Sequence, residues 1–221
     1  AALSLLENGY SINIFEEGEK FNRDEFNLSK FDSLSKYWRY NGVTPVFGKP
    51  FLTYGEGMAI GGSTVINGGV ITTIRDNLLM KWSDQVDKQI FDEKLYFSNC
   101  KNIEDKLLVR QQYKNFEIAS ASSQVLVDAA IKKNFKTRKI NRALINCENK
   151  NNCPFGCTSG AKQSLDLNYH KKILQLGGQI NSGKKVLKIE VENDRASKLI
   201  IFDKIKNKTF EKKINNLILA C

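Results

Sequence analysis

The fold is decided by residues 1–18, which read AALSLLENGYSINIFEEG. Residues 1–8 have the apolar pattern of the last turns of an amphipathic helix, and Gly9 is typical of the left-handed cap that ends one. The stretch from Tyr10 to Phe15 then predicts a strand. A helix that leads into a strand is the second half of a βαβ unit, so this stretch predicts an α/β fold.

The residue at the end of that strand is a candidate binding residue. In dinucleotide-binding folds, an acidic side chain at this position accepts hydrogen bonds from the adenosine ribose hydroxyls. Glu16 occupies the position here, although a solvated glutamate at a strand end remains the alternative. The glycine-rich phosphate loop that precedes the helix in such folds is absent, and residues 217–221 stop inside an apolar run. We therefore expect a chain truncated at both ends.

A second informative stretch is residues 54–69, YGEGMAIGGSTVINGG. Its glycines allow main-chain atoms to approach a flat ring system closely. Ser63 and Thr64 are predicted to cap a helix whose N-terminal amides suit phosphate or a reduced flavin, and the Asn67 amide offers both a donor and an acceptor. The alternative is a glycine-rich turn and a capped helix without a ligand. The candidate residues are Gly61, Gly62, Ser63, Thr64, Asn67 and Gly68.

Together with Glu16, this stretch resembles the flavin-contacting segment of the glucose-methanol-choline (GMC) oxidoreductases. Residues 153–164, CPFGCTSGAKQS, precede a predicted helix and a strand that begins at Lys185. They are similar to the part of that family that leads into the strand contacting adenine. The resemblance covers residues 1–20, 54–75 and 147–221.

The resemblance implies an FAD cofactor and a role for each matching residue. Glu16 would hold the ribose, and the main chain of Val186 would pair with the adenine edge. The residues that would line the pyrophosphate and isoalloxazine are Ser63, Asn67, Gly68 and Val70. The implied reaction is oxidation of a small-molecule alcohol by hydride transfer to the flavin, followed by electron transfer to oxygen, a quinone or a protein. The family's catalytic histidine lies in a C-terminal segment that is missing here, so we predict no catalytic residue in this chain and no activity from it alone.

The resemblance also implies a Rossmann-type FAD/NAD(P)-binding fold with a helical insertion and a β-meander. We expect residues 1–20, 54–75 and 147–221 to form the FAD-binding domain. Residues 21–53 should form a surface connection, and residues 76–146 should form the mainly helical insertion. The alternation of Leu187, Ile189 and Val191 with charged residues predicts a half-buried strand of the meander. The apolar residues 216–220 predict a buried strand parallel to residues 11–16.

Composition leaves two other function classes open. The 221 residues carry 34 lysines and arginines against 24 acidic residues, a net charge of +10 that could mark a nucleic-acid binder. Because the positive charges are mostly lysines spread along the chain, we expect no nucleic-acid partner. We also expect no transmembrane segment, since no window approaches about 18 consecutive apolar residues. The alternatives are a reductase-like or amine-oxidase-like flavoprotein, which also has a glutamate at the strand end where Glu16 lies, and a basic nucleic-acid-binding module with a cysteine-rich zinc loop.

We expect the cysteines and the single histidine to have structural rather than metal-binding or catalytic roles. Five cysteines are an odd number, which favours reduced thiols and a cytoplasmic protein. Cys147, Cys153 and Cys157 cluster, but their spacing differs from a zinc knuckle and no fourth ligand is evident, so we predict no metal site. His170 lies in a lysine-flanked helical stretch and is predicted to face solvent.

Overall fold

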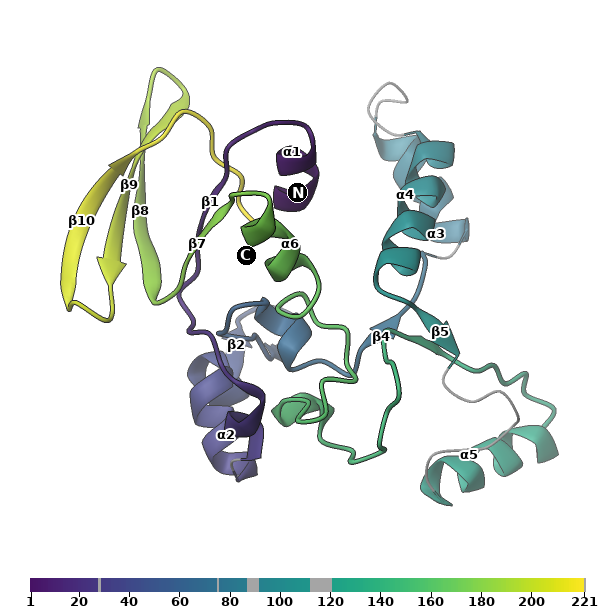
Figure 1. The fold of residues 1–221 in the computed structure, drawn as a ribbon. Coiled ribbons are helices and arrows are strands. Elements are labelled where there is room, and N and C mark those ends of the chain that lie inside the picture. Colours follow the sequence, from purple (N-terminus) through teal and green to yellow (C-terminus); the bar gives the residue numbers. More distant parts are fainter. Residues whose placement is uncertain (28, 75, 87–91, 112–120, 221) are drawn as a thin grey trace. The chain divides into compact units, whose positions relative to one another are not determined.

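The computed structural model describes residues 1–27, 29–74, 76–86, 92–111 and 121–220 (Figure 1). The chain divides into two compact units: unit 1 comprises residues 1–66, 154–158 and 165–221, and unit 2 comprises residues 67–153 and 159–164. Unit 1 contains the predicted half of a βαβ unit and the predicted meander. The residues expected to form the helical insertion all lie in unit 2.

Unit 1 combines short helices with three small sheets, in agreement with the predicted α/β class. Its elements are α1 (Ala2–Glu7), β1 (Asn13–Phe15), η1 (Arg23–Asn27), α2 (Lys30–Tyr37), η2 (Arg39–Gly42), β2 (Thr44–Val46), β3 (Leu52–Tyr54), η3 (Gly62–Val65), α6 (Tyr169–Gln175), β7 (Gln179–Asn181), β8 (Lys184–Glu192), β9 (Arg195–Asp203) and β10 (Lys208–Lys213). A further short helix, η4 (Cys153–Phe155), begins at the last residue of a unit 2 segment and continues into unit 1.

The opening of the chain forms the predicted helix and a strand that is shorter than the predicted Tyr10–Phe15. Helix α1 ends where Gly9 adopts a φ of +83°, the left-handed conformation that glycine takes without steric cost. Strand β1 follows and pairs in parallel with β7, with Ile14 opposite Ile180. Helix α1 packs on α6, the helix that precedes β7 (Figure 1). Both strands of this parallel pair are thus preceded by a helix, as in an α/β arrangement.

The strand predicted at residues 216–220 is not present. These residues lie outside any strand, and β1 pairs only with β7 among the described residues; Cys221 lies outside them. A parallel strand forms only when a neighbour accepts and donates its main-chain hydrogen bonds. Ile218 and Leu219 are 58% and 69% exposed, so the apolar run has no burial to hold it in a sheet.

The predicted meander is present as the antiparallel sheet β8–β9–β10. Leu199 and Ile201 on β9 are buried. In contrast, Leu187 and Val191 on β8 are exposed, which differs from the predicted half-buried face. The register of β8 against β9 shifts after Val186 and again after Glu190, and such irregularities interrupt the strict alternation on which that prediction rests.

The core of unit 1 includes residues from the segment predicted as a surface connection. Helix α2 lies in this segment, and its N-cap Ser29 accepts a hydrogen bond from the Asp32 amide. The rings of Phe26 and Tyr37 are fully buried and meet edge to face, 5.1 Å between centroids. They pack with Val65 and other residues of the glycine-rich stretch. This segment therefore supports the stretch that carries the candidate residues.

Unit 2 is mainly helical and contains one small antiparallel sheet in the order β4–β6–β5. Its elements are β4 (Val70–Ile71), α3 (Asp76–Gln85), α4 (Glu93–Lys106), β5 (Arg110–Gln111), α5 (Ala121–Lys132) and β6 (Asn141–Arg142). Val125 and Leu126 on α5 are exposed. Within the described ranges, no helix is both long enough and apolar enough to cross a membrane.

Candidate functional site

The end of β1 is held by main-chain hydrogen bonds to the segment between β7 and β8. The Glu16 amide donates to the Asn181 carbonyl at 2.9 Å, and the Glu16 carbonyl accepts from the Lys184 amide at 2.8 Å. Two residues further on, the Gly18 carbonyl accepts from the Gly183 amide at 3.0 Å. Three consecutive bonds of this kind fix the main chain at the strand end, and with it the starting point of the Glu16 side chain.

The Glu16 carboxylate is partly buried and oriented by its own turn. Its Oε1 accepts a hydrogen bond from the Gly18 amide at 2.7 Å. Burial raises the pKa of the Glu16 carboxyl above its ordinary value, and the hydrogen bond from Gly18 opposes that shift. A carboxylate held in this way is a ready acceptor for hydroxyl groups, which is the chemistry predicted for it.

The other side of this strand end meets the glycine-rich stretch. The Ile60 amide donates to the Glu19 carbonyl at 2.9 Å, and Glu19 forms a parallel bridge with Ala59. A Cβ at Gly18 would overlap the main chain of Met58 and Ala59, so the two segments touch at this glycine. Within unit 1, residues 18–19, which follow Glu16 by two residues, therefore lie directly against residues 58–60 of the glycine-rich stretch.

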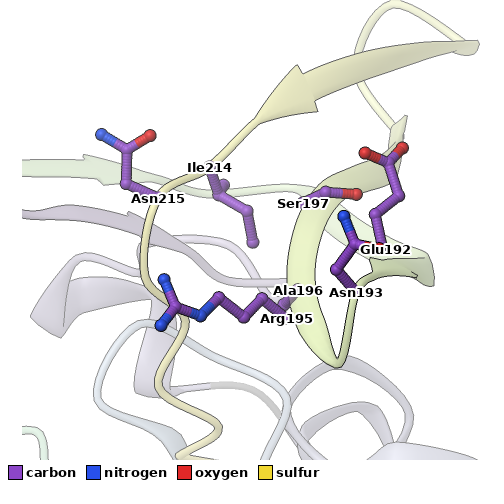
Figure 2. Close-up of a pocket in the computed structure, with 7 residues that line it drawn as sticks. All are labelled: Glu192, Asn193, Arg195, Ala196, Ser197, Ile214 and Asn215. Carbon is purple, nitrogen blue, oxygen red and sulfur yellow. The ribbon is translucent and has the colours of Figure 1, made fainter.

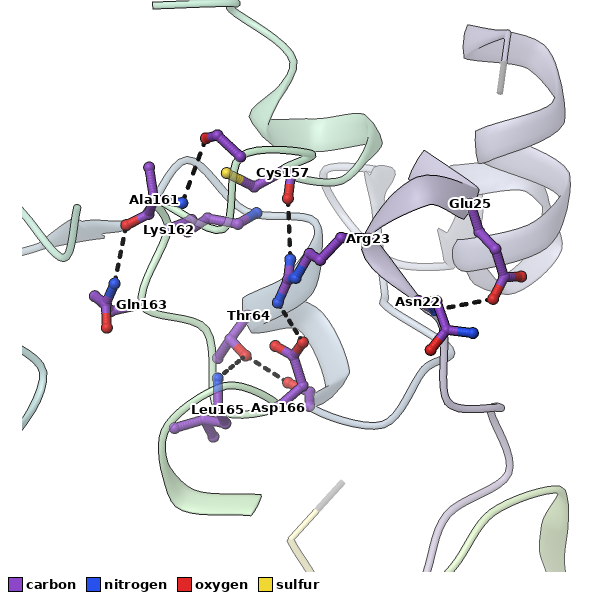
Figure 3. A network of polar contacts seen from close by, with 12 residues as sticks. Asn22, Arg23, Glu25, Thr64, Cys157, Ala161, Lys162, Gln163, Leu165 and Asp166 are labelled. Atoms are coloured by element: carbon purple, nitrogen blue, oxygen red, sulfur yellow. Dashed lines mark hydrogen bonds and ion pairs between the residues drawn. The ribbon is translucent and has the colours of Figure 1, made fainter. Parts of the chain in front are cut away.

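The glycine-rich stretch forms a tight turn that its hydroxyl side chains hold together. Gly61 adopts a φ of +98°, and the Gly57 amide donates to the Ser63 Oγ at 2.9 Å. The Thr64 hydroxyl donates to the Gly61 carbonyl and accepts from the Leu165 amide (Figure 3). The expected capped helix is only the short η3, whose N-cap is Gly61 rather than a hydroxyl residue. Ser63 and Thr64 thus shape the turn with their side chains.

Two glycines of this stretch border open space. A Cβ at Gly62 would meet nothing within 4 Å, and one at Gly68 would meet only the Val70 Cγ2, at 3.9 Å. In contrast, a Cβ at Gly57 would lie 2.8 Å from main-chain atoms of Gly62 and Ser63. Gly57 is therefore needed for packing, and a left-handed φ of +56° accounts for the glycine at Gly62, whereas neither packing nor conformation accounts for Gly68. The open space beside Gly68 leaves its main chain accessible to a planar group, so this residue fits a flavin.

In unit 2, two cations hold the carbonyl groups of the predicted flavin segment. The Lys162 Nζ donates to the Asn67 carbonyl at 2.8 Å, and its side chain is almost fully buried. The Arg142 guanidinium donates to the Gly68 carbonyl through Nε at 3.0 Å and through a terminal nitrogen at 2.6 Å. The Asn67 Oδ1 accepts from the Gly69 amide at 2.9 Å. These bonds fix the main chain here, while Asn67 and Val70 stay exposed.

The predicted site residues are divided between the two units. Unit 1 contains Glu16, Gly61, Gly62, Ser63, Thr64 and Val186, and unit 2 contains Asn67, Gly68 and Val70. Val186 lies on β8 opposite Ile201 and is 38% exposed. The residues predicted for the adenosine and for the glycine turn therefore belong to the same unit.

One ion pair beside the glycine turn is not evident from the sequence. The Arg23 guanidinium donates to the Asp166 carboxylate at 2.6 Å and to the Cys157 carbonyl at 3.1 Å (Figure 3). A Cβ at Gly61 would lie 3.0 Å from the Asp166 amide nitrogen, so this pair packs directly against the turn. Arg23 and Asp166 are 143 residues apart, and no local pattern links them.

The sequence predicts that His170 faces solvent, but in the structure its side chain is half-buried. Its Nε2 is buried and has no hydrogen-bond partner among the described residues. Burial, and to a smaller extent the charge of Lys20, lower the pKa of His170, while Asp166 raises it. The flanking lysines show that α6 carries charge, but they do not reveal whether a side chain in its first turn is buried. That depends on packing inside unit 1.

A depression elsewhere in unit 1 is separate from the predicted residues. It lies at the β8–β9 turn and the segment after β10, and its lining includes Glu192, Arg195, Ser197 and Asn215 (Figure 2). None of the predicted site residues lines it. Its open, polar character gives no reason to assign a flavin to it.

The cysteines form no metal centre in the part of the chain that the structure describes. No three histidine, cysteine or acidic side chains lie close enough there to hold a metal ion. Cys100, Cys147, Cys153 and Cys157 are thiols, and Cys221 lies outside the described residues.

Comparison with known proteins identifies the family. Residues 35–221 match the family model of the GMC oxidoreductases. An uncharacterized GMC-type oxidoreductase of Sinorhizobium fredii is 24% identical over 196 residues, which are 87% of this chain and 37% of that protein. A second one, of Mycobacterium tuberculosis, is 27% identical over 191 residues, 85% of this chain and 30% of the relative.

A functionally named relative also matches. A long-chain-alcohol oxidase of Arabidopsis thaliana is 22% identical over 198 residues, which are 89% of this chain and 26% of the plant protein. The chain therefore spans between about a quarter and two fifths of the length of these curated relatives.

Proposed function

The chain belongs to the GMC oxidoreductase family, and on that premise we propose that it is the FAD-binding part of an enzyme that oxidises the CH–OH group of an alcohol. The N-terminal domain of this family is the FAD-binding domain, so FAD is the cofactor. When bound, FAD supplies the hydride acceptor. The chain's own residues bind and orient it in a Rossmann-type fold, of which α1, β1 and β7 form the parallel part.

Each predicted residue has a stated task in this proposal. Glu16 accepts hydrogen bonds from the ribose hydroxyls, and the main chain of Val186 pairs with the adenine edge. The glycine turn of Gly61 and Gly62, with the main chain of Ser63 and Thr64, approaches the pyrophosphate. The residues that line the isoalloxazine and the adjoining pyrophosphate are Asn67, Gly68 and Val70. No residue of this chain is proposed as catalytic.

One observation carries the proposal. The end of β1 presents a partly buried carboxylate on a main chain that is fixed by Asn181 and Lys184 on one side. On its other side the strand end touches a glycine turn that leads to Gly62, where space is open. A carboxylate for a ribose beside a glycine turn for a pyrophosphate is the pattern of a dinucleotide site.

The alcohol substrate is supported by family and by one relative. The plant relative is named a long-chain-alcohol oxidase, although it is only 22% identical. We therefore place long-chain alcohols first among the candidate substrates. The final electron acceptor is an oxidant such as oxygen, a quinone or an acceptor protein.

The proposal is tested by flavin reduction in the full-length protein. The purified protein is mixed anaerobically with a panel of primary and secondary alcohols of increasing chain length, and the flavin absorption bands are followed. We expect at least one alcohol to bleach the bands. Bleaching by amines or by NAD(P)H, with none by alcohols, would instead support an amine-oxidase-like or reductase-like flavoprotein.

A further inference from the structure

Glu17, next to the proposed ribose-binding residue, is contacted by three positively charged side chains. Its Oε2 lies 2.6 Å from a terminal nitrogen of Arg39. Its Oε1 lies 3.1 Å from the Lys204 Nζ and 3.3 Å from the Lys185 Nζ. We call these four residues the Glu17 cluster. All of them belong to unit 1.

The Glu17 cluster joins segments that are far apart in the sequence. Arg39 comes from η2, Lys185 from β8, and Lys204 directly follows β9. Arg39 is itself held by Glu56, through a main-chain hydrogen bond of 2.8 Å and an ion pair of 3.1 Å at its Nε. The Glu17 carboxylate therefore connects the meander and the segment after α2 to the end of β1, where Glu16 lies.

The burial of the cluster separates it from ordinary surface ion pairs. The Glu17 side chain is 14% exposed and that of Arg39 is 23% exposed. Burial opposes the charge on Glu17, but the hydrogen bonds from Arg39 and Lys204 are stronger in sum and lower its pKa. Several cations around a partly buried carboxylate restrict its position. An isolated ion pair on the exposed surface, in contrast, contributes little to stability.

The cluster also acts on the neighbouring carboxylate. Burial raises the pKa of Glu16, and the charge of Glu17 raises it further, whereas Arg39 and Lys204 lower it. The cations thus offset a repulsion that two adjacent carboxylates would otherwise have. Glu17 pairs with both of these cations beside the end of β1.

We propose that Glu17 is a positioning residue for the cofactor site: by gathering Arg39, Lys185 and Lys204 at the end of β1, it holds Glu16 where the adenosine ribose binds. This inference rests on the proposed function, because it takes Glu16 as the ribose acceptor. Glu17 itself makes no contact with the cofactor in this proposal.

A double-mutant cycle on FAD binding tests the proposal. Apoprotein is prepared from the full-length protein, and FAD dissociation constants are measured for Glu17→Gln, Glu16→Gln and the double variant. A hydrogen bond to a charged group contributes about 1.5–3 kcal/mol, roughly 10- to 150-fold in affinity. We expect Glu17→Gln to weaken FAD binding about tenfold, and to have less than about a twofold effect once Glu16 is already replaced.

Two further variants make the outcome decisive. Glu190→Gln is the matched control, because Glu190 is also a carboxylate between two lysines, Lys188 and Lys198, but lies away from β1 on β8. It should leave FAD affinity unchanged. If Glu17→Gln does not fold, Lys204→Gln removes one cation from a 33% exposed position and should weaken binding by a smaller factor through Glu16.

The measurements distinguish failure of the positioning role of Glu17 from failure of the ribose assignment of Glu16. Equal losses from Glu17→Gln with and without Glu16 would show that Glu17 acts only on general stability, and would overturn the positioning role alone. An unchanged dissociation constant for Glu16→Gln would overturn both the ribose assignment and the positioning role that depends on it.

Discussion

His170 shows how burial of one side chain makes the stability of the protein depend on pH. Its folded-state pKa is lowered, chiefly by burial, below the ordinary value of about 6.5 that applies to the unfolded chain. Below that pH the unfolded chain takes up a proton that the folded protein does not, so the free energy of unfolding falls. We expect the melting temperature to decrease as the pH is lowered from about 7 towards 5.

The variant His170→Gln isolates this contribution. It removes the titrating group, so its melting temperature should depend less steeply on pH over the same range. The raised pKa of Glu16 acts in the opposite direction at lower pH, but it is common to both proteins and cancels in the comparison. Identical pH profiles for the two proteins would show that His170 is not held neutral by burial.

Two glycines of the glycine-rich stretch allow an effect on packing to be distinguished from an effect on FAD binding. Gly57→Ala would place a Cβ 2.8 Å from the main chain of Gly62, so it should lower the free energy of unfolding by about 1–3 kcal/mol. Gly68→Ala meets only ordinary contacts, so it should change stability by about 0.5 kcal/mol or less while weakening FAD binding. Thermal denaturation and FAD titration of both variants test this. A Gly68→Ala protein with full FAD affinity would contradict the approach of the flavin at this residue.

Local sequence predicts a residue's role only where the role is set by its neighbours in the chain. Glu16 could be identified because it directly follows a strand, and the Gly61 turn because its glycines are adjacent. The contact of Arg23 with Asp166 spans 143 residues, and Glu17 meets its cations from three separate elements. Such pairings come from tertiary packing, and a charged side chain in the sequence looks the same whether it is solvated or paired.

Strand β9 is the element that anchors the meander. Ile201 is fully buried, so Ile201→Ala should lower the free energy of unfolding by about 2–5 kcal/mol. Leu187→Ala on the neighbouring β8 is the control, since Leu187 is 54% exposed and should cost little. Chemical denaturation of both variants checks the difference. Comparable losses would mean that Leu187 is covered in solution.

Helices and strands are predicted correctly where the local sequence pattern determines them. The prediction fails where a strand needs a neighbouring strand to pair with. Helix α1, its Gly9 cap and the end of β1 follow from residues 1–15, whereas the meander is expected from the family resemblance. The strand at residues 216–220 depends on a neighbour that it does not have among the described residues. The irregular register of β8 is likewise decided by its pairing with β9.

For the whole molecule, the chain spans 37% of the Sinorhizobium relative and 26% of the plant alcohol oxidase. We expect residues 1–221 by themselves, supplied with FAD, to oxidise no alcohol, because none of their residues is proposed to accept the proton of the substrate. A missing base typically lowers the rate about 10²- to 10⁴-fold. The measurement is flavin reduction by the alcohol panel, compared with the full-length protein. Turnover by the 221-residue chain that disappears in His170→Ala would make His170 the base.

The measurement that tests the account most directly is the FAD dissociation constant of Glu16→Ala beside that of Val186→Ile, both in the full-length protein. A carboxylate that accepts ribose hydroxyls contributes about 1.5–3 kcal/mol, so Glu16→Ala should weaken FAD binding roughly 10- to 150-fold. Val186 is proposed to act through its main chain, so Val186→Ile should bind FAD like the wild type. Unchanged binding in Glu16→Ala, or equal losses in both variants, would contradict the placement of the cofactor at the end of β1.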